Sequence, residues 1–378
     1  MFPPRALPSI LTFLELSVNG QLIMLNSEIP GIHSGRTPFY NERLSRSYAH
    51  FFRMANTATD RLFFASAEDF LPDGTVRGHW VPDAHGWRPV EESTTLGLLF
   101  DKLGGDDALF KAVIARVIEL EIPIFGHYGL NRFTGDKWAC YEAFPSQHAL
   151  TRLIDPDRDT TETQIDAFFS LMDSHYLRHD DVAVVKPRWG WESRGLYLLS
   201  RRTDGITLHA LSGQQILHPG RVHHALDELS TTPYIIQAYV NTREGIPEIG
   251  LHPERHDARF IFSIREPGVA QFFQAYVKTP NEMLYYPLEA FPQQAYNVLE
   301  SVADEVARRF PYGIFSVDIM RDVSGNWYLT ELNDQVGFNI DFNSPRDIEG
   351  VGQLMRRYLD ELYALRENGH LAQYQSPV

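Results

Sequence analysis

The sequence predicts a mixed α/β (α+β) protein of two or three lobes. With 378 residues, the chain exceeds the size that one hydrophobic core usually serves. Strand patterns and amphipathic helix patterns follow one another along the chain, as they do in α/β and α+β folds. A hydrophobic fraction of 43% and an aromatic fraction of 12% predict well-filled cores and argue against disorder.

Residues 1–130 are predicted to form an N-terminal mixed α/β lobe. Residues 9–26 have the pattern of one or two strands that turn at Asn19-Gly20, and 27–42 have the composition of a loop. The remaining elements are expected to be a helix over 43–56, a strand over 62–65, a turn over 71–74, strands over 76–81 and 87–90, a helix over 106–120 and a strand over 122–125.

The helix predicted over 43–56 carries a basic stripe opposite its apolar side. Arg43, Arg46, His50 and Arg53 fall on this stripe at helical spacing. Such a stripe can bind an anionic substrate, so Arg43, Arg46 and Arg53 are candidate anchors for a substrate carboxylate. The alternative is a solvated helix face, which is the commoner use of such a stripe.

Two further lobes are predicted over 131–240 and 241–378. The first is expected to contain a helix over 137–144 that ends at Pro145, a helix over 162–175, a buried strand over 181–186, and strands over 197–199, 207–209 and 234–240. The second is expected to contain a hairpin of strands 259–264 and 270–278 that turns at Pro267-Gly268, helices over 292–310 and 346–366, and a second hairpin between those helices.

The second hairpin carries the most informative side chains in the chain. Its strands are predicted over 316–320 and 327–332, with the turn at Gly325-Asn326. Because alternate residues of a strand point the same way, Asp318, Glu331 and Asn333 should lie close together. Carboxylate and amide oxygens suit Mg²⁺ that also binds nucleotide phosphates. The alternative is an ordinary acidic hairpin tip.

A loop that suits phosphate binding follows the strand that ends at Lys186. Residues 187–195 contain spaced glycines and a serine, and their backbone amides could close over phosphates while Lys186 supplies a positive charge. A plain hairpin loop is the alternative. The sequence contains no GxxxxGK[ST] P-loop, no GxGxxG fingerprint, no GxSxG elbow and no HExxH zinc helix.

Composition narrows the classes of partner. The formal charge of −15 argues against nonspecific binding to nucleic acid or to an anionic membrane. A single cysteine, Cys140, excludes an internal disulfide framework, and we expect it to be a buried bystander. No apolar run is long enough to cross a membrane, and no signal-peptide pattern is present, so we expect a cytoplasmic protein.

Taken in order, these motifs resemble the ATP-grasp superfamily, in particular its glutathione-synthetase-like and peptide-ligase-like members. The resemblance covers about residues 130–345 and depends on Lys137 in GDKWACYEAF, Lys186, the strand YIIQAYV, the pair Asp257 and Arg259 in HDARFIF, and the carboxylate hairpin. The N-terminal part, with FFASAEDFLPDGTVRGHW, is loosely similar to spore-coat-associated ATP-grasp proteins. The family's usual Pro-Gly turn after the ExN motif is replaced by Val336-Gly337.

The resemblance implies a fold of two α+β subdomains that clasp ATP, and it assigns roles to residues. Lys137, Lys186, Ser193 and Gly195 would contact phosphates. Gln237, Ala238 and Val240 would form the hinge that receives adenine, with Glu244 as a ribose contact. Asp257, Arg259, Lys278 and Asn281 would lie near the transferred phosphoryl group, with Arg259 and Lys186 in catalytic roles. Asp318, Glu331 and Asn333 would be the ligands of Mg²⁺, and the resemblance implies two such ions.

The implied function is an ATP-dependent ligase that joins a carboxylate to an amine through an acyl phosphate and releases ADP and phosphate. Its partners would be a small-molecule carboxylate, such as an amino acid or peptide, and an amine; a homodimer is possible through helix 346–366. Two alternatives stay open. One is a nucleotide-binding structural or regulatory protein without turnover, and the other is a ligase with a thiol or carrier-protein-bound acceptor.

Overall fold

The computed structural model of the chain describes residues 21–26, 30–39, 41–56, 62–83, 86–101, 108–174, 181–189, 195–202, 205–210, 233–252, 255–280, 282–334, 337 and 340–367. The chain divides into two compact units. Unit 1 comprises Met1–Tyr40, Phe52–Phe125 and Leu362–Ser376, and unit 2 comprises Asn41–Phe51, Gly126–Glu361 and Pro377–Val378. The division into three lobes at residues 130 and 240 stays a prediction. None of the described helices is long and apolar enough to span a bilayer.

Unit 1 is built on a seven-stranded sheet in the order β3-β6-β1-β2-β4-β5, with β7 paired to β6. Its strands are β1 (Gln21–Asn26), β2 (Leu62–Ser66), β3 (Thr75–Val76), β4 (His79–Asp83), β5 (Gly86–Val90), β6 (Thr94–Asp101) and β7 (Ile124–Phe125). The central strand β1 runs parallel to both β2 and β6. Short 3-10 helices η1 (Ile32–Ser34) and η2 (Ala67–Asp69) and helix α2 (Ala108–Glu119) complete this unit.

Helix α1 (Glu42–Ala55) is shared between the two units, because residues up to Phe51 belong to unit 2 and the rest to unit 1. Its apolar side is fully buried at Phe51 and Phe52. In unit 1, Phe52 packs against Phe64 with ring centroids 5.1 Å apart, and Phe64 packs against Trp87 at 5.3 Å. The helical periodicity read from the sequence therefore corresponds to a real core face.

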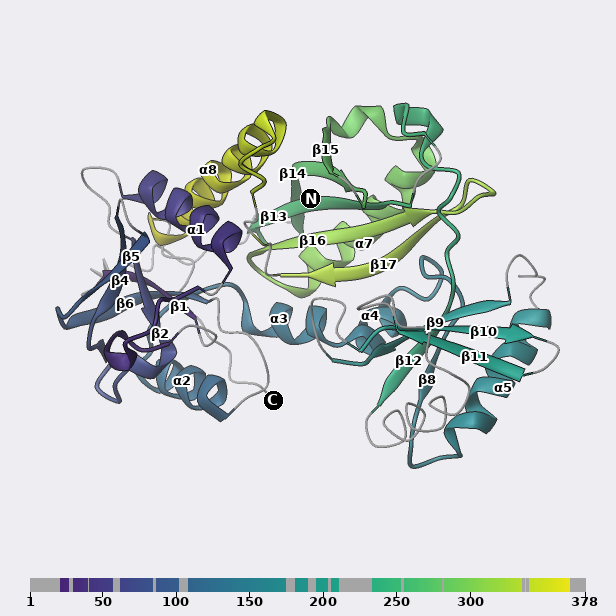
Figure 1. Cartoon of the computed structure of the whole chain (residues 1–378), viewed down its shortest axis with the longest axis horizontal. Coiled ribbons are helices and arrows are strands. Elements are labelled where there is room, and N and C mark those ends of the chain that lie inside the picture. Colours follow the sequence, from purple (N-terminus) through teal and green to yellow (C-terminus); the bar gives the residue numbers. More distant parts are fainter. Residues whose placement is uncertain are drawn as a thin grey trace, which may run out of the picture. The chain divides into compact units, whose positions relative to one another are not determined.

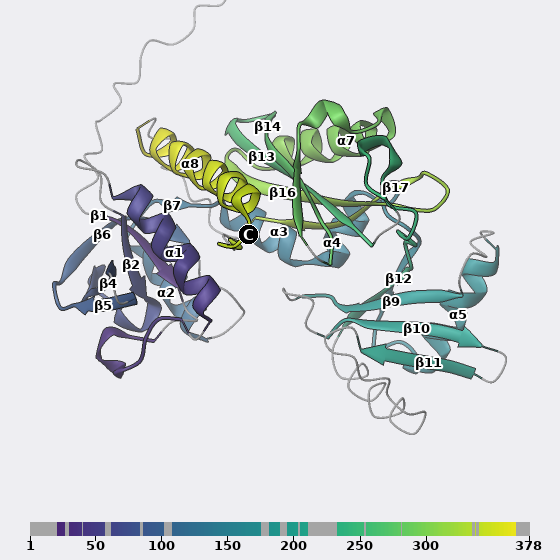
Figure 2. The ribbon, with the colours of Figure 1, turned by 45° about the horizontal axis from the view of Figure 1, so that its top comes forward.

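The first sheet of unit 2 has five antiparallel strands in the order β11-β10-β9-β12-β8. They are β8 (Thr151–Ile154), β9 (Val182–Pro187), β10 (Tyr197–Arg202), β11 (Gly205–Ala210) and β12 (Tyr234–Ala238). Helix α5 (Thr161–Ser174) packs on one face and shares a core with Ala183 and Val185 of β9 (Figure 2). Because side chains alternate along a strand, Val182, Val184 and Lys186 point to the other face.

The second sheet of unit 2 also has five strands, in the order β15-β14-β13-β16-β17. They are β13 (Asp257–Glu266), β14 (Val269–Lys278), β15 (Met283–Tyr286), β16 (Gly313–Arg321) and β17 (Trp327–Asn333). Helix α7 (Gln293–Arg309) lies against one face, as Figure 1 shows, and buries Leu299, Val302 and Val306 with Phe260 and Val317. The same core contains Leu130 of α3 (Tyr128–Gly135) and Cys140 of α4 (Lys137–Ala143). It also contains Phe144, which follows α4.

The remaining elements of unit 2 are η3 (Pro247–Ile249), η4 (Leu288–Ala290) and the long helix α8 (Pro345–Glu367), whose last turns belong to unit 1. Glu361 of α8 is buried and ion-paired with Arg265 of β13 at 2.7 Å, which attaches the helix to the second sheet. The segment between α4 and β8 is bonded to the second sheet. The N–H of Leu329 in β17 donates to the C=O of Gln147 at 2.7 Å, and His148 forms an isolated parallel bridge with Leu329.

Most of the predicted elements are confirmed, including both hairpins with their turns at Pro267-Gly268 and Gly325-Asn326. The predicted strand over 76–81 was wrong as one element, because β3 ends at Val76 and β4 begins at His79. A Cβ on the intervening Gly78 would lie 2.5 Å from the Val90 carbonyl oxygen, so the backbones approach closely there. Helix α3 and strands β6, β8 and β15 were not predicted. The predicted strand and turn before residue 21 lie outside the described residues.

Candidate active site

A row of opposed side chains crosses four strands of the second sheet, on the face away from α7. Tyr276 of β14 lies opposite Arg259 of β13, Arg259 lies opposite Asp318 of β16, and Asp318 lies opposite Glu331 of β17. Directly opposed residues on neighbouring strands are close enough for their side chains to interact. We call these residues, Tyr276, Arg259, Asp318 and Glu331, the cross-strand row. The sequence analysis assigned Arg259, Asp318 and Glu331 to one site. The strand register of the structure places them side by side.

Asp318 is the most tightly bound member of the cross-strand row. Both of its oxygens accept from Arg259, at 2.7 Å from Nε and 2.5 Å from the terminal nitrogen, and its side chain is only 2% exposed. Lys278 lies 3.8 Å from Asp318 and 3.5 Å from Asp257. Burial alone would raise the pKa of Asp318, but Arg259 and Lys278 outweigh it and hold the pKa below its ordinary value.

Asp257 and Lys278 form the next opposed pair of the same sheet. Burial, followed by the nearby charge of Asp318, raises the pKa of Asp257 to about 6. Burial would lower the pKa of Lys278, but the charges of Asp318 and Asp257 outweigh it and raise that pKa. One oxygen of Asp257 is buried and has no hydrogen-bond partner among the described residues.

The two lysines predicted to contact phosphates converge on Glu331. Lys137 is the first residue of α4, and its ammonium lies 3.8 Å from the Glu331 carboxylate. Lys186 lies near the end of β9 and donates to the C=O of Thr330 at 3.3 Å. Burial lowers the pKa of both lysines, and it lowers that of Lys186 to about 8 even though Glu331 favours the charged form. Both ammonium groups therefore point toward the same end of β17.

The predicted adenine hinge lines a pocket of about 110 Å³ at the end of β12. Ala238, Tyr239 and Val240 form one wall. Among the described residues, no backbone hydrogen bond engages the C=O of Ala238 or the N–H of Val240, whereas the N–H of Ala238 donates to Leu150 and that of Tyr239 donates to Val182. These two unpaired backbone groups are the acceptor and donor that an adenine edge could use.

The side chain of Gln237, the first residue of the predicted hinge, belongs to a buried polar cluster with Thr151 and His148. Its amide donates to the Thr151 hydroxyl at 3.0 Å and lies 3.5 Å from Nδ1 of His148. Burial, followed by the charge of Lys186, lowers the pKa of His148 to about 3, so the imidazole is neutral at pH 7. The Gln237 side chain therefore holds the first residue of the predicted hinge by buried hydrogen bonding.

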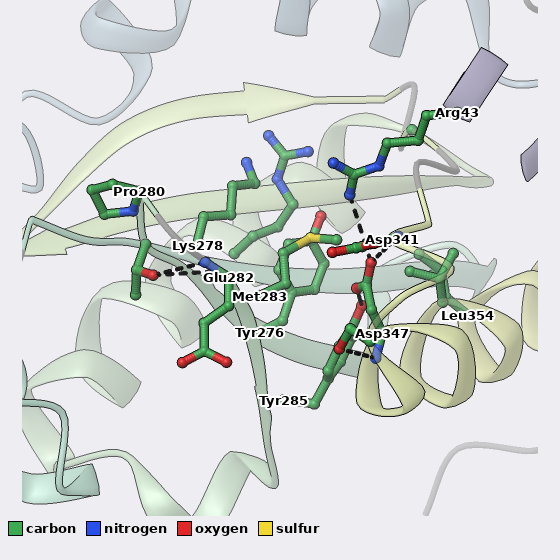
Figure 3. Close-up of a pocket in the computed structure, with 15 residues that line it drawn as sticks. Arg43, Tyr276, Lys278, Pro280, Glu282, Met283, Tyr285, Asp341, Asp347 and Leu354 are labelled. Atoms are coloured by element: carbon green, nitrogen blue, oxygen red, sulfur yellow. Dashed lines mark hydrogen bonds and ion pairs between the residues drawn. The ribbon is translucent and has the colours of Figure 1, made fainter.

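A larger pocket of about 380 Å³ opens beside the cross-strand row. Arg259 and Tyr276 of the row line it together with Lys278, and Figure 3 shows Lys278 and Arg43 at the same pocket. The other lining residues are Arg43, Thr279, Pro280, Glu282, Met283, Tyr285, Gly337, Asp341, Ser344, Asp347, Val351 and Leu354. The pocket thus combines positive charge, carboxylates and an apolar wall next to the predicted phosphoryl-transfer residues.

The three candidate arginines of α1 contact different partners. Arg43 lines the larger pocket, where it donates to the C=O of Ile340 at 3.0 Å and lies 3.7 Å from Asp347. Arg46 lies over the ring of Phe342, 4.3 Å from its centroid. Arg53 donates to the C=O of Asp83 at 3.0 Å in unit 1. Of the three, the geometry brings Arg43 to the pocket wall.

The remaining predicted residues are less informative. Ser193 and Asn281 lie outside the described residues. Gly195 ends the predicted phosphate loop with a left-handed φ of 69°, a conformation that favours glycine. Glu244 is exposed in the turn that follows the hinge. Cys140 is buried and its Sγ lies 3.2 Å from the C=O of Phe133, as expected for a bystander; burial raises the pKa of its thiol.

Magnesium binding can be judged from the donor set. Among the described residues, no cluster of three or more His, Cys, Asp or Glu side chains is arranged to hold a metal ion. Arg259 donates to both oxygens of Asp318. The donors nevertheless suit a hard cation: Asp318 and Glu331 are opposed, and the Asn333 amide is buried with its nitrogen unpartnered among those residues. The donor types therefore fit the ion, and Asp318 would have to share its oxygens between Arg259 and the metal.

Sequence reasoning did not identify several residues of these pockets. Tyr276 lies two positions before Lys278 on β14, so the period of two along a strand could have indicated it. Tyr285 lies on β15, which was not predicted, and Asp347 lies in the first turn of α8, 62 positions further along the chain, where Tyr285 donates to it at 3.0 Å. No local signal connects those two residues.

Comparison with known proteins supports the fold. No protein-family profile matches the chain. No curated protein sequence matches it either. Solved structures do match. D-alanyl-alanine synthetase A from Vibrio cholerae has a TM-score of 0.54 at 12% identity, over 92% of this chain and 99% of that one.

Two further structures match over similar lengths. The VanG D-Ala:D-Ser ligase from Enterococcus faecalis has a TM-score of 0.53 at 13% identity, over 91% of this chain and 99% of that one. The D-alanine–D-alanine ligase from Bacillus anthracis complexed with ATP has a TM-score of 0.52 at 12% identity, over 93% and 99%. These ligases are ATP-grasp enzymes, and the chain has their mixed α/β fold.

Proposed function

We propose that this protein is an ATP-dependent ligase that joins a carboxylate to an amine and releases ADP and phosphate. One observation carries the proposal. Lys137 pairs with Glu331, and Lys186 donates to the C=O of the preceding residue, Thr330, at the end of the row that also holds Arg259 and Asp318. Burial disfavours the charge of both lysines, and a bound polyphosphate would offset that cost.

The nucleotide is expected to extend from the hinge pocket to the cross-strand row. Adenine would lie against Ala238 and Val240, whose C=O and N–H have no backbone partner among the described residues. The phosphates would follow Lys186 and Lys137 toward Arg259. Asp318, Glu331 and Asn333 would hold Mg²⁺, and the bound metal would offset charge on the β- and γ-phosphates.

The chemistry requires no protein nucleophile. An oxygen of the substrate carboxylate attacks the γ-phosphorus, the bond to the β-phosphate oxygen breaks, and ADP leaves. The amine nitrogen then attacks the carbonyl carbon of the acyl phosphate, loses a proton, and expels phosphate. Arg259 and Lys278 line the pocket of about 380 Å³ and would stabilise the charge that moves onto the transferring group.

Measurement of products tests the proposal against its alternatives. The protein is incubated with ATP, Mg²⁺ and pooled amino acids, and mass spectrometry records the products. We expect ADP, phosphate and an amide, and we expect phosphate release to depend on a carboxylic acid. AMP and pyrophosphate would instead indicate an adenylating enzyme.

Two further results would favour the other candidates. ATP binding with no phosphate release across a broad panel of acids and amines would indicate a nucleotide-binding protein without turnover. A thioester product would indicate a thiol acceptor or a carrier-bound acceptor. The pocket beside Arg259 is large enough for either a free amino acid or the end of a longer group, so its volume alone does not select the acceptor.

A further inference from the structure

An ion pair outside the cross-strand row joins the two elements that carry the predicted phosphate lysines. Arg188 follows β9, and Asp136 lies between α3 and α4. The guanidinium of Arg188 donates to both oxygens of Asp136, at 2.8 Å from Nε and 2.7 Å from the terminal nitrogen. The two side chains are 26% and 14% exposed, so water screens this pair less than a surface pair.

Asp136 also fixes the first turn of α4. As its N-cap, Asp136 accepts the N–H groups of Trp138 at 3.0 Å and Ala139 at 3.2 Å. A carboxylate at this position also complements the positive end of the helix. Lys137 is the first residue of this helix, so the cap determines where the Lys137 side chain begins.

The backbone reinforces the same junction. The N–H of Lys137 donates to the C=O of Arg188 at 3.0 Å, and Asp136 forms an isolated antiparallel bridge with Trp189. Arg188 also lies over the Trp189 ring, 4.5 Å from its centroid. The start of α4 and the end of β9 are therefore held together at the point where the predicted phosphate loop begins.

We propose that the Asp136–Arg188 ion pair is a positioning device that sets the separation of Lys137 and Lys186 before ATP binds; the inference rests on the proposed function. Lys137 is adjacent to Asp136 in sequence, and Lys186 is two residues before Arg188. Two ammonium groups that converge on one carboxylate repel each other when no triphosphate is present. The bidentate pair of Arg188 and Asp136 joins the two elements that carry these lysines. It therefore keeps the two charges from moving apart and preorganises them for the phosphates.

Two conservative substitutions separate positioning from general stability. Asp136→Asn keeps an N-cap of equal quality but removes the charge that binds Arg188. Arg188→Lys keeps the charge but removes the planar fork. Arg201→Lys is the matched control. Arg201 lies on β10 of the same sheet, outside the described pockets. It makes a similar bidentate pair with Asp173, at 3.0 and 2.6 Å, and also binds Asp181.

Calorimetry on the full chain with Mg²⁺ gives the dissociation constants of AMP and ATP for each variant. We expect Asp136→Asn and Arg188→Lys to weaken ATP binding about 10- to 100-fold, as loss of a supporting contact typically does, and to change AMP binding by less than about twofold. The control should change neither constant by more than about twofold. Circular dichroism on heating establishes whether each variant is folded. If Asp136→Asn is not folded, Arg188→Lys alone tests the proposal.

The outcomes distinguish this inference from the proposed function. An unchanged ratio of the ATP and AMP constants in folded variants would overturn the positioning role and leave the pair a structural contact. Equal weakening in Arg201→Lys would overturn it too, since the effect would then reflect general loosening of the sheet. A wild-type chain that binds no ATP would instead overturn the proposed function, on which the inference depends.

Discussion

Glu331→Gln is the substitution that best separates metal and phosphate binding from folding. The Glu331 side chain is 32% exposed, and its ion pair with Lys137 has a separation of 3.8 Å. Glutamine preserves the shape and keeps an oxygen at the same place, but it removes the negative charge. Glu331 ends the cross-strand row opposite Asp318 and takes no part in the hydrogen bonds between Asp318 and Arg259, so the substitution leaves those bonds in place.

The structure predicts a small cost in stability and a large cost in activity. With Lys137 12% and Glu331 32% exposed, a pair at this separation is expected to contribute about 1 kcal/mol to the free energy of unfolding. That is a small part of the roughly 5–15 kcal/mol of a typical domain. Loss of one charge aimed at the reacting group should lower phosphate release about 10²- to 10³-fold, which corresponds to roughly 3–4 kcal/mol of transition-state stabilisation.

The assay is phosphate release as a function of Mg²⁺ concentration, with unfolding by urea measured alongside. We expect Glu331→Gln to raise the Mg²⁺ concentration that gives half-maximal rate as well as to lower the maximal rate. Glu248→Gln is the control, because Glu248 is 34% exposed and pairs with Arg321 at 3.3 Å outside the described pockets. Full phosphate release by Glu331→Gln at ordinary Mg²⁺ would remove Glu331 from the metal site and refute the reasoning.

Asp318→Asn should lower the free energy of unfolding by about 3–5 kcal/mol in urea denaturation, because it leaves Arg259 buried without its counter-charge; a loss below about 1 kcal/mol would contradict this. Val182→Phe should fill the hinge pocket of about 110 Å³ and weaken ATP binding at least about 10-fold by calorimetry; unchanged affinity would place adenine elsewhere. Lys186 has a folded-state pKa of about 8, below its ordinary 10.5, so its buried charge destabilises the fold fully below pH 8 and stability rises as the pH increases between these values. Lys186→Met should lack that rise when unfolding is compared at pH 7.5 and pH 10, and equal slopes in both proteins would contradict the burial of the charge.

The parts of the site that local sequence determines could be predicted. The β16–β17 hairpin has a clear turn at Gly325, which brings Asp318 and Glu331 close together. A register shift between Asp318 and Ile319, which the turn does not predict, sets Asp318 directly opposite Glu331. Local sequence also brings Asp257 and Arg259 together, because they are two positions apart on one strand. Short-range geometry thus accounts for most of the predicted site residues that the structure brings together.

Long-range pairing could not be predicted. The pair of Arg259 and Asp318 depends on the register between β13 and β16, which lie 59 positions apart at these residues, and no turn connects them. This register explains why the Asp318 carboxylate binds the Arg259 guanidinium. The sequence analysis had predicted Asp318 only as a metal ligand. Likewise, Tyr285 and Arg43 reach Asp347 from distant parts of the chain.

The elements that were not predicted have weak local signals for physical reasons. The core strand β6 is an apolar run with Gly97 inside it, and a strand buried on both faces shows no alternation. Strand β8 has four residues, and one of them is Arg152. Helix α3 contains Gly129 and ends at Gly135, both poor helix formers, and His127 caps it by accepting the N–H of Leu130.

The charge balance of the site indicates why a divalent cation should accompany the nucleotide. Without ligand, the buried groups nearly neutralise one another; they are the cations Lys137, Lys186, Arg259 and Lys278 and the carboxylates Asp257, Asp318 and Glu331. A triphosphate adds several negative charges to this set, in which Arg259, Lys278 and Lys137 already have carboxylate partners. Binding must therefore bring positive charge with it or turn Arg259 away from Asp318. Under the proposed function, Asp318 would be a ligand of Mg²⁺, and the bound ion would supply the positive charge that the phosphates need. Arg259, which now pairs with Asp318, would then be available to the transferring phosphoryl group.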